Sequence, residues 1–171
     1  MLLFARIAGL AVFAALVAGL MSVPLLAQDR PDRTAEIRSR FSREPDPVRK
    51  AKMLPQLSDS EFRQVQPLLA AGNLTEASAI AHQLADEAES AVKGLDARGR
   101  DPEQHAEGYR QAEISVRISL RRMDDILVGL SAEDQKPFIE VRHRLDDLER
   151  HLIRELFPHR PDAPAAAEPK S

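Results

Sequence analysis

The chain has 171 residues, of which 43% are apolar, 30% charged and only 4% aromatic, with no cysteine and no tryptophan. So few aromatic residues, together with abundant alanine, leucine, glutamate and arginine, favour helices over a β-sandwich. The formal net charge of −3 argues against a nucleic-acid binder, which presents a strongly basic surface. The absence of cysteine excludes disulfides, a lipid-modified cysteine anchor, a cysteine nucleophile and thiolate metal sites.

Residues 1–27 predict an export segment. Arg6 supplies a positive amino-terminal region, residues 7–21 form an uncharged apolar run, and Pro24 precedes a short region that ends at Ala27. We expect cleavage after Ala27. The alternative is an uncleaved anchor, because the apolar run is long enough to span a bilayer. Either outcome places the functional part in the periplasm or in the extracellular space.

Short helices are expected to follow this segment. Residues 28–33 are polar and predicted to be flexible, and residues 34–43 predict a short helix. Asp46 and Pro47 form a favoured pair of cap and first helical residue. Pro55 is expected to end or kink the helix that they begin, because proline lacks a backbone N–H donor.

The next helix is predicted to begin at residues 58–61, because Ser-Asp-Ser-Glu fits the capping box. Gly72 stands where a left-handed cap would close that helix. Asn73 or Thr75 then begins a helix over residues 74–95. The apolar stripe of this last helix is rich in alanine, which lets a neighbouring helix approach closely.

Two long amphipathic helices, over residues 109–130 and 131–157, are predicted to form the hairpin that organises the chain. Gly108 is expected to separate a leading turn, begun by Asp101 and Pro102, from the first of these helices. The second helix, capped by Ser131 and with Pro137 as the alternative start of its long part, carries one apolar stripe. The stripe consists of Phe138, Val141, Leu145, Leu148, Leu152 and Leu156.

The first helix of this hairpin is apolar on two sides. Its main apolar arc includes Val116, Leu120 and Met123, whereas Ile114 and Ile118 fall on the opposite side at about 100° per residue. Such a helix is either central in a bundle or carries a surface that binds a partner. Ile114 and Ile118 are therefore the candidate interaction patch.

These elements predict an all-α protein. We expect an up-down helical bundle of about four main helices with short N-terminal helices, preceded by the export segment. Residues 34–157 would form this single domain. Residues 158–171 are rich in proline and alanine and predict a disordered tail.

Glu140 and His143 have the Glu-x-x-His spacing that carboxylate-bridged di-iron sites use in helical bundles. Both residues lie opposite the apolar stripe of their helix, so we expect them to face water, and His143 shares this polar face with His151. The sequence has no glycine-rich phosphate loop, no Gly-x-Ser-x-Gly elbow and no His-Glu-x-x-His motif. We therefore predict no catalytic residue, no metal site and no cofactor.

Short segments resemble two known families. Gly72-Asn73-Leu74-Thr75-Glu76-Ala77 resembles the turn and second-helix start of a tetratricopeptide repeat, which implies a helical-repeat binding module. Leu57-Ser58-Asp59-Ser60-Glu61 and Leu130-Ser131-Ala132-Glu133-Asp134 resemble the LTxxQ motif, which occurs twice in Spy/CpxP-like periplasmic chaperones and related metal-stress sensors. Serine replaces threonine in both copies, and Glu61 and Asp134 replace glutamine. This second resemblance implies a small exported helical chaperone or stress sensor.

The sequence thus predicts an exported, non-catalytic helical protein that acts by protein–protein contact. Its partner would be another protein or a second copy of the chain. No nucleic acid is expected, and a membrane is expected only through residues 1–27 if they stay attached. The alternatives are the chaperone or stress sensor and the helical-repeat binding module.

Overall fold

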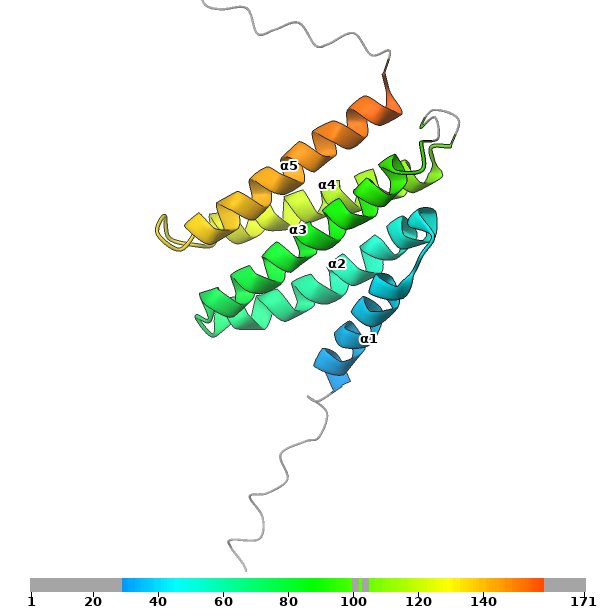
Figure 1. Ribbon diagram of the computed structural model, residues 1–171. Coiled ribbons are helices and arrows are strands. Elements are labelled where there is room, and N and C mark those ends of the chain that lie inside the picture. Colours follow the sequence, from blue (N-terminus) through cyan, green and yellow to red (C-terminus); the bar gives the residue numbers. More distant parts are fainter. Residues whose placement is uncertain (1–28, 100–101, 103–104, 159–171) are drawn as a thin grey trace, which may run out of the picture. The chain divides into compact units, whose positions relative to one another are not determined.

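A computed structural model describes residues 29–99, 102 and 105–158, and all regular secondary structure within these residues is α-helical (Figure 1). The prediction of an all-α protein is confirmed. The predicted export segment at residues 1–27 and residues 159–171 of the predicted tail lie outside the described residues. The helices of the described part are α1 (Asp29–Arg43), α2 (Pro47–Ala70), α3 (Leu74–Asp96), α4 (Glu107–Val128) and α5 (Lys136–Leu156). None of them is long and apolar enough to cross a bilayer.

The chain divides into two compact units, Met1–Arg33 and Thr34–Ser171. The described residues of the first unit form the start of α1. In the second unit, α2 packs against α3 and α4 packs against α5, so that two helical hairpins follow one another along the chain (Figure 1). The hairpins contact each other through α2 with α4 and through α3 with both α4 and α5.

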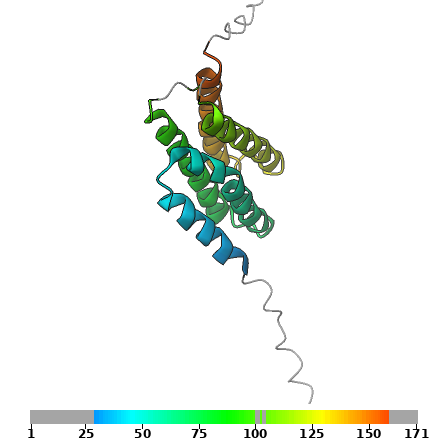
Figure 2. The ribbon, with the colours of Figure 1, turned by 90° about the vertical axis from the view of Figure 1, so that its right-hand side faces the viewer.

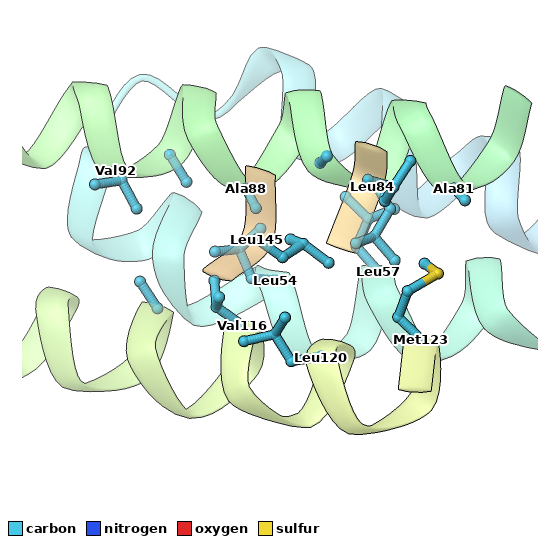
Figure 3. Packing of buried hydrophobic residues seen from close by; sticks show 14 of the residues in the cluster. Leu54, Leu57, Ala81, Leu84, Ala88, Val92, Val116, Leu120, Met123 and Leu145 are labelled. Atoms are coloured by element: carbon cyan, nitrogen blue, oxygen red, sulfur yellow. The ribbon is translucent and has the colours of Figure 1, made fainter. Parts of the chain in front are cut away.

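One hydrophobic core joins these helices, and apolar side chains from each of them contribute to it (Figure 3). The α3 stripe contains five buried alanines, which are Ala77, Ala81, Ala85, Ala88 and Ala91. They allow α3 to contact three other helices at once. The expectation that the alanine-rich stripe packs against neighbouring helices is confirmed.

Helix α1 begins at Asp29, so the prediction that this helix starts at residue 34 was wrong. Pro31 is compatible with this earlier start because it lies in the first turn, where backbone N–H groups have no helical partner. Ile37 and Phe41 of α1 are buried at 2% exposure each.

Helix α2 is one continuous helix of 24 residues with Pro55 and Pro67 inside it. Of the two alternatives predicted for Pro55, an end or a kink of the helix, the end was wrong. An internal proline costs roughly 3 kcal/mol. Leu54 and Leu57, on either side of Pro55, are at most 1% exposed, and burial of each contributes roughly 1.5–3 kcal/mol. Packing therefore outweighs the proline. The predicted cap at Ser58 is also wrong, because this residue lies in the middle of the helix.

Several predicted helix ends are confirmed. The Asp46 side chain caps α2 by accepting hydrogen bonds from the backbone N–H groups of Val48 and Arg49. Asn73 caps α3 in the same way by accepting from the N–H of Glu76. Gly72 adopts a left-handed conformation with φ of 73°. The N–H groups of Gly72 and Asn73 then donate to the carbonyls of Leu69 and Leu68, which closes the end of α2.

Replacing Gly72 with alanine should lower the free energy of unfolding by about 1 kcal/mol, because a Cβ disfavours the left-handed backbone conformation. No atom lies within 4 Å of the added Cβ, so conformation alone accounts for the loss. Gly129→Ala is the matched control, since φ there is −83°, and it should not destabilise the protein. Urea unfolding of both variants checks the difference, and equal midpoints would contradict it.

Helix α4 begins at Glu107 and contains Gly108, so the prediction that Gly108 separates a leading turn from the helix was wrong. A Cβ at this position would lie 2.6 Å from Leu95 Cδ2. Glycine is thus needed for close contact between helices, not as a helix breaker. Pro102 lies in a turn, and the predicted start signal at Asp101 lies outside the described residues.

The connection from α4 to α5 is longer than predicted, because α5 begins at Lys136 and not at Ser131. The Ser131 hydroxyl still accepts a hydrogen bond from the N–H of Asp134, but within the turn. Gln135 closes the end of α4 by donating to the carbonyls of Leu127 and Leu130. The predicted stripe of α5 is buried, except for Leu148, which is only partly buried against the core.

Candidate functional site

The outward side of α4 carries Ile114 and Ile118, which the sequence singles out as a candidate interaction patch. Ile114 and Ile118 are 40% and 43% exposed, whereas Val116 and Met123 on the opposite side of the helix are at most 1% exposed. The helix is therefore buried on one side only. Its second apolar side is not central in the bundle but lies at the surface.

Arginines surround the two isoleucines. Arg110, Arg117 and Arg121 are exposed, and their spacing of three, four or seven residues from Ile114 places them on the same side of the helix. Arg117 forms an ion pair of 3.3 Å with Glu113. Within the described part of the chain, Arg110 and Arg121 form no ion pair. We call Ile114, Ile118 and these three arginines the α4 patch.

The residues with metal-site spacing lie on the surface of α5. Glu140 and His143 are exposed, as predicted. His151 instead contacts α3, with its Nε2 atom 3.0 Å from Asp96 Oδ2. Among the described residues, no three histidine, aspartate or glutamate side chains come together in a way that could hold a metal ion.

A buried charged cluster between α1, α2 and α3 was not predicted. Glu61 of α2 has a fully buried side chain, and Glu87 of α3 is 13% exposed. The guanidinium group of Arg38 of α1 donates to both carboxylates, from Nη2 to Glu61 Oε1 at 2.8 Å and from Nε to Glu87 Oε1 at 3.2 Å. We call Arg38, Glu61 and Glu87 the charged trio.

Burial dominates the electrostatics of the charged trio. Burial and the neighbouring Glu87 carboxylate raise the pKa of Glu61 to about 8, against the opposing effect of Arg38. Burial also raises the pKa of Glu87, although hydrogen bonds from Glu61 and Gln83 and the charge of Arg38 act in the other direction. Burial disfavours the charged form of a carboxylate, so the protonated form of Glu61 is favoured at neutral pH.

Next to the charged trio, an open groove of about 670 Å³ runs along α3. It is lined by Phe41, Ser42, Lys50, Ala79, His82, Gln83, Asp86, Glu87 and Ser90. Lys50 lies over the Phe41 ring, with Nζ 4.8 Å from the ring centre, and donates to the Ser90 hydroxyl at 3.2 Å. Because both basic and acidic side chains line the groove, its charges favour no single class of ligand.

The sequence does contain a signal for the buried Glu61. This residue lies four positions after Leu57 and four before Val65, both of which are at most 1% exposed. A glutamate in the apolar stripe of a helix is rarely buried without a partner. Glu61 also fits a capping box with Ser58. Because this pattern indicates a helix start, Glu61 was not placed in the apolar stripe from the sequence. Its partners come from two other helices and could not be inferred from local spacing.

The segments that resemble known families occupy different settings in the structure. Leu57-Ser58-Asp59-Ser60-Glu61 lies in the middle of α2, whereas Leu130-Ser131-Ala132-Glu133-Asp134 lies in the turn before α5. The turn at Gly72 and Asn73 does join two packed helices, but these have 24 and 23 residues, longer than those of a 34-residue repeat. Comparisons with protein-family models, curated protein sequences and solved structures found no match to this chain.

Proposed function

We propose that this chain is an exported, non-catalytic helical protein that acts by protein–protein contact through the α4 patch. In this proposal α2, α3, α4 and α5 form an up-down bundle, and residues 1–27 direct the chain out of the cytoplasm. The observation that carries the proposal is the exposure of Ile114 and Ile118, at 40% and 43%. Ile114 and Ile118 are four residues apart and therefore neighbours on the helix surface, and adjoining exposed apolar side chains are typical of interaction surfaces.

The charges of the α4 patch indicate what kind of partner fits. Arg110, Arg117 and Arg121 surround the isoleucines, so a segment with apolar residues flanked by acidic ones would complement the patch. Two copies of the chain joined through this surface would bring like charges together, which disfavours self-association. We therefore favour a different protein with an acidic, partly apolar helix or strand as the partner.

Ile118→Glu should abolish the complex while leaving the helix content unchanged, because the side chain is exposed and a carboxylate there opposes apolar contact. The measurement is co-purification of the full chain from its native envelope, with mass spectrometry of the partners and of the mature N-terminus. Circular dichroism of the purified variant checks the fold. We expect the wild type to recover one partner at a constant ratio and the variant to recover at least tenfold less, equivalent to about 1.4 kcal/mol.

Ile139→Glu is the matched control, because Ile139 of α5 is 36% exposed but lies outside the patch. This variant should bind as the wild type does. Loss of helix content in Ile118→Glu would show that the residue belongs to the core. A folded Ile118→Glu variant that retains its partner would rule out the α4 patch as the contact surface. An N-terminus at Met1 would show that residues 1–27 are retained.

A further inference from the structure

The charged trio places a fully buried carboxylate, Glu61, and a largely buried one, Glu87, beside one cation, Arg38. Glu61 Oε2 and Glu87 Oε2 are buried and have no hydrogen-bond partner among the described residues, although each carboxylate accepts from Arg38 through its other oxygen. A buried oxygen without a donor costs about 1–3 kcal/mol, and more when it is charged. The arrangement therefore lacks one donor.

A single proton supplies that donor. Glu61 and Glu87 both accept from the Arg38 guanidinium group, which brings the two carboxylates together, so a protonated Glu61 can donate to the Glu87 carboxylate. Two carboxylates this close do not both ionise at neutral pH, and one retains its proton. With one proton, the charges of Glu61, Glu87 and Arg38 sum to zero, and the buried group carries no net charge.

We propose that Glu61 and Glu87 share one proton and that this proton keeps residues 34–43 of α1 packed on α2 and α3. Loss of the proton leaves two buried carboxylates with one cation. The side chain of Glu61 is fully buried, and α1, which lies beside α2 (Figure 2), supplies the Arg38 that contacts it. The charged form of Glu61 therefore gains water when α1 moves away. The inference concerns a switch within the fold and does not depend on the α4 patch.

The neighbouring charges do not replace the proton. On α3, Gln83 donates to Glu87 Oε1 at 3.2 Å, but Asp86 and Glu89 are occupied by Arg144 of α5 at 2.5 and 2.8 Å. On α2, Asp59 binds Arg63 and also Arg122 of α4. His82 and Lys50 line the groove beside Glu87, and Lys50 donates to Ser90. Thr34 and Ser60 form a hydrogen bond of their own between α1 and α2.

The direction of the pH effect follows from the raised pKa of Glu61. The pKa is about 8 in the folded protein against 4.5 for an ordinary glutamate, so the folded state retains a proton that the unfolded chain loses. The stabilisation is fully present below pH 4.5. It decreases as the pH rises and is lost above about pH 8.

Hydrogen exchange of the full chain, measured by mass spectrometry and corrected for the intrinsic rate at each pH, tests the proposal. Protection of the backbone amides at residues 34–43 should fall by up to roughly tenfold for each pH unit between about pH 4.5 and pH 8 and level off above about pH 8, while protection in α5 stays constant. Glu61→Gln should remove this dependence, because its amide donates to Glu87 at every pH and its oxygen still accepts from Arg38.

Glu36→Gln is the matched control, because Glu36 is an exposed acid of α1 paired only with Arg40, and this variant should keep the wild-type pH dependence. Glu87→Gln serves as the reciprocal variant if Glu61→Gln does not fold, and it should likewise flatten the profile. Constant protection of α1 in the wild type from pH 6 to pH 10 would overturn the proposal. So would an unchanged pH dependence in a folded Glu61→Gln or Glu87→Gln variant.

Discussion

Replacing Leu145 with glutamate should unfold the protein. Leu145 lies in α5, is 1% exposed, and points into the same region of the core as Leu54 and Ala88 (Figure 3). Truncating a buried leucine already costs about 2–5 kcal/mol, and a carboxylate without a partner adds a further penalty. The sum is comparable with the whole stability of a small domain, about 5–15 kcal/mol. Circular dichroism at 222 nm should show loss of most helical signal.

Two further glutamate variants on α5 test whether the loss of stability follows the burial of the replaced side chain. Leu148 is only partly buried, so Leu148→Glu should destabilise the protein less than Leu145→Glu. The sequence alone predicts the same outcome for both, because they share one stripe. Ile139→Glu, at 36% exposure, should remain folded. If Leu145→Glu keeps the wild-type helical signal and melting temperature, the described packing of α5 on the core is wrong.

Replacing Ala88 with leucine should have the second largest effect on stability. Ala88 is 4% exposed on α3, the helix that contacts α2, α4 and α5. A larger side chain here must displace well-packed neighbours, which typically costs 1–3 kcal/mol. For a domain of this size the melting temperature should fall by roughly 3–12 °C. Thermal unfolding followed by circular dichroism measures the change.

Ala79→Leu controls for the substitution itself. Ala79 lies on the same helix but is exposed, and leucine is nearly as good a helix former as alanine. This variant should unfold within about 0.5 kcal/mol of the wild type. A similar loss of stability in both variants would mean that helix propensity causes the effect. Unchanged stability of Ala88→Leu would show that α3 is not closely packed at this position.

Helix ends governed by local chemistry could be predicted from the sequence. Asp46, Gly72 and Asn73 each act through backbone groups only a few residues away, so their spacing in the chain determines their geometry. The apolar stripes of α4 and α5 were predicted for a similar reason, because a helix repeats its faces every 3.6 residues. These features led to the correct fold class.

Positions governed by contacts between helices could not be predicted in this way. Pro55 does not end α2, because its apolar neighbours are buried against other helices. Gly108 is needed for its closeness to Leu95, 13 positions earlier in the chain. Glu61 depends on Arg38 and Glu87, which belong to two other helices. In each case the local sequence pattern predicted a helix end or cap, and contacts between helices determined a different structure.

The same limit applies to the α4 patch. The sequence places Ile114 and Ile118 on a second apolar side but does not reveal whether a neighbouring helix covers it. In the structure, α2 and α5 pack on the opposite side of α4, and the side with Ile114 and Ile118 stays at the surface.

The division of the chain into two consecutive hairpins also has a consequence for folding kinetics. The α2–α3 and α4–α5 pairs bring together helices that are adjacent in the sequence, so many native contacts form after closure of a short loop. Closing short loops costs less chain entropy than pairing distant segments. Helical domains with such local contacts fold in microseconds to milliseconds. Each hairpin can thus form early, and docking of one hairpin on the other completes the core.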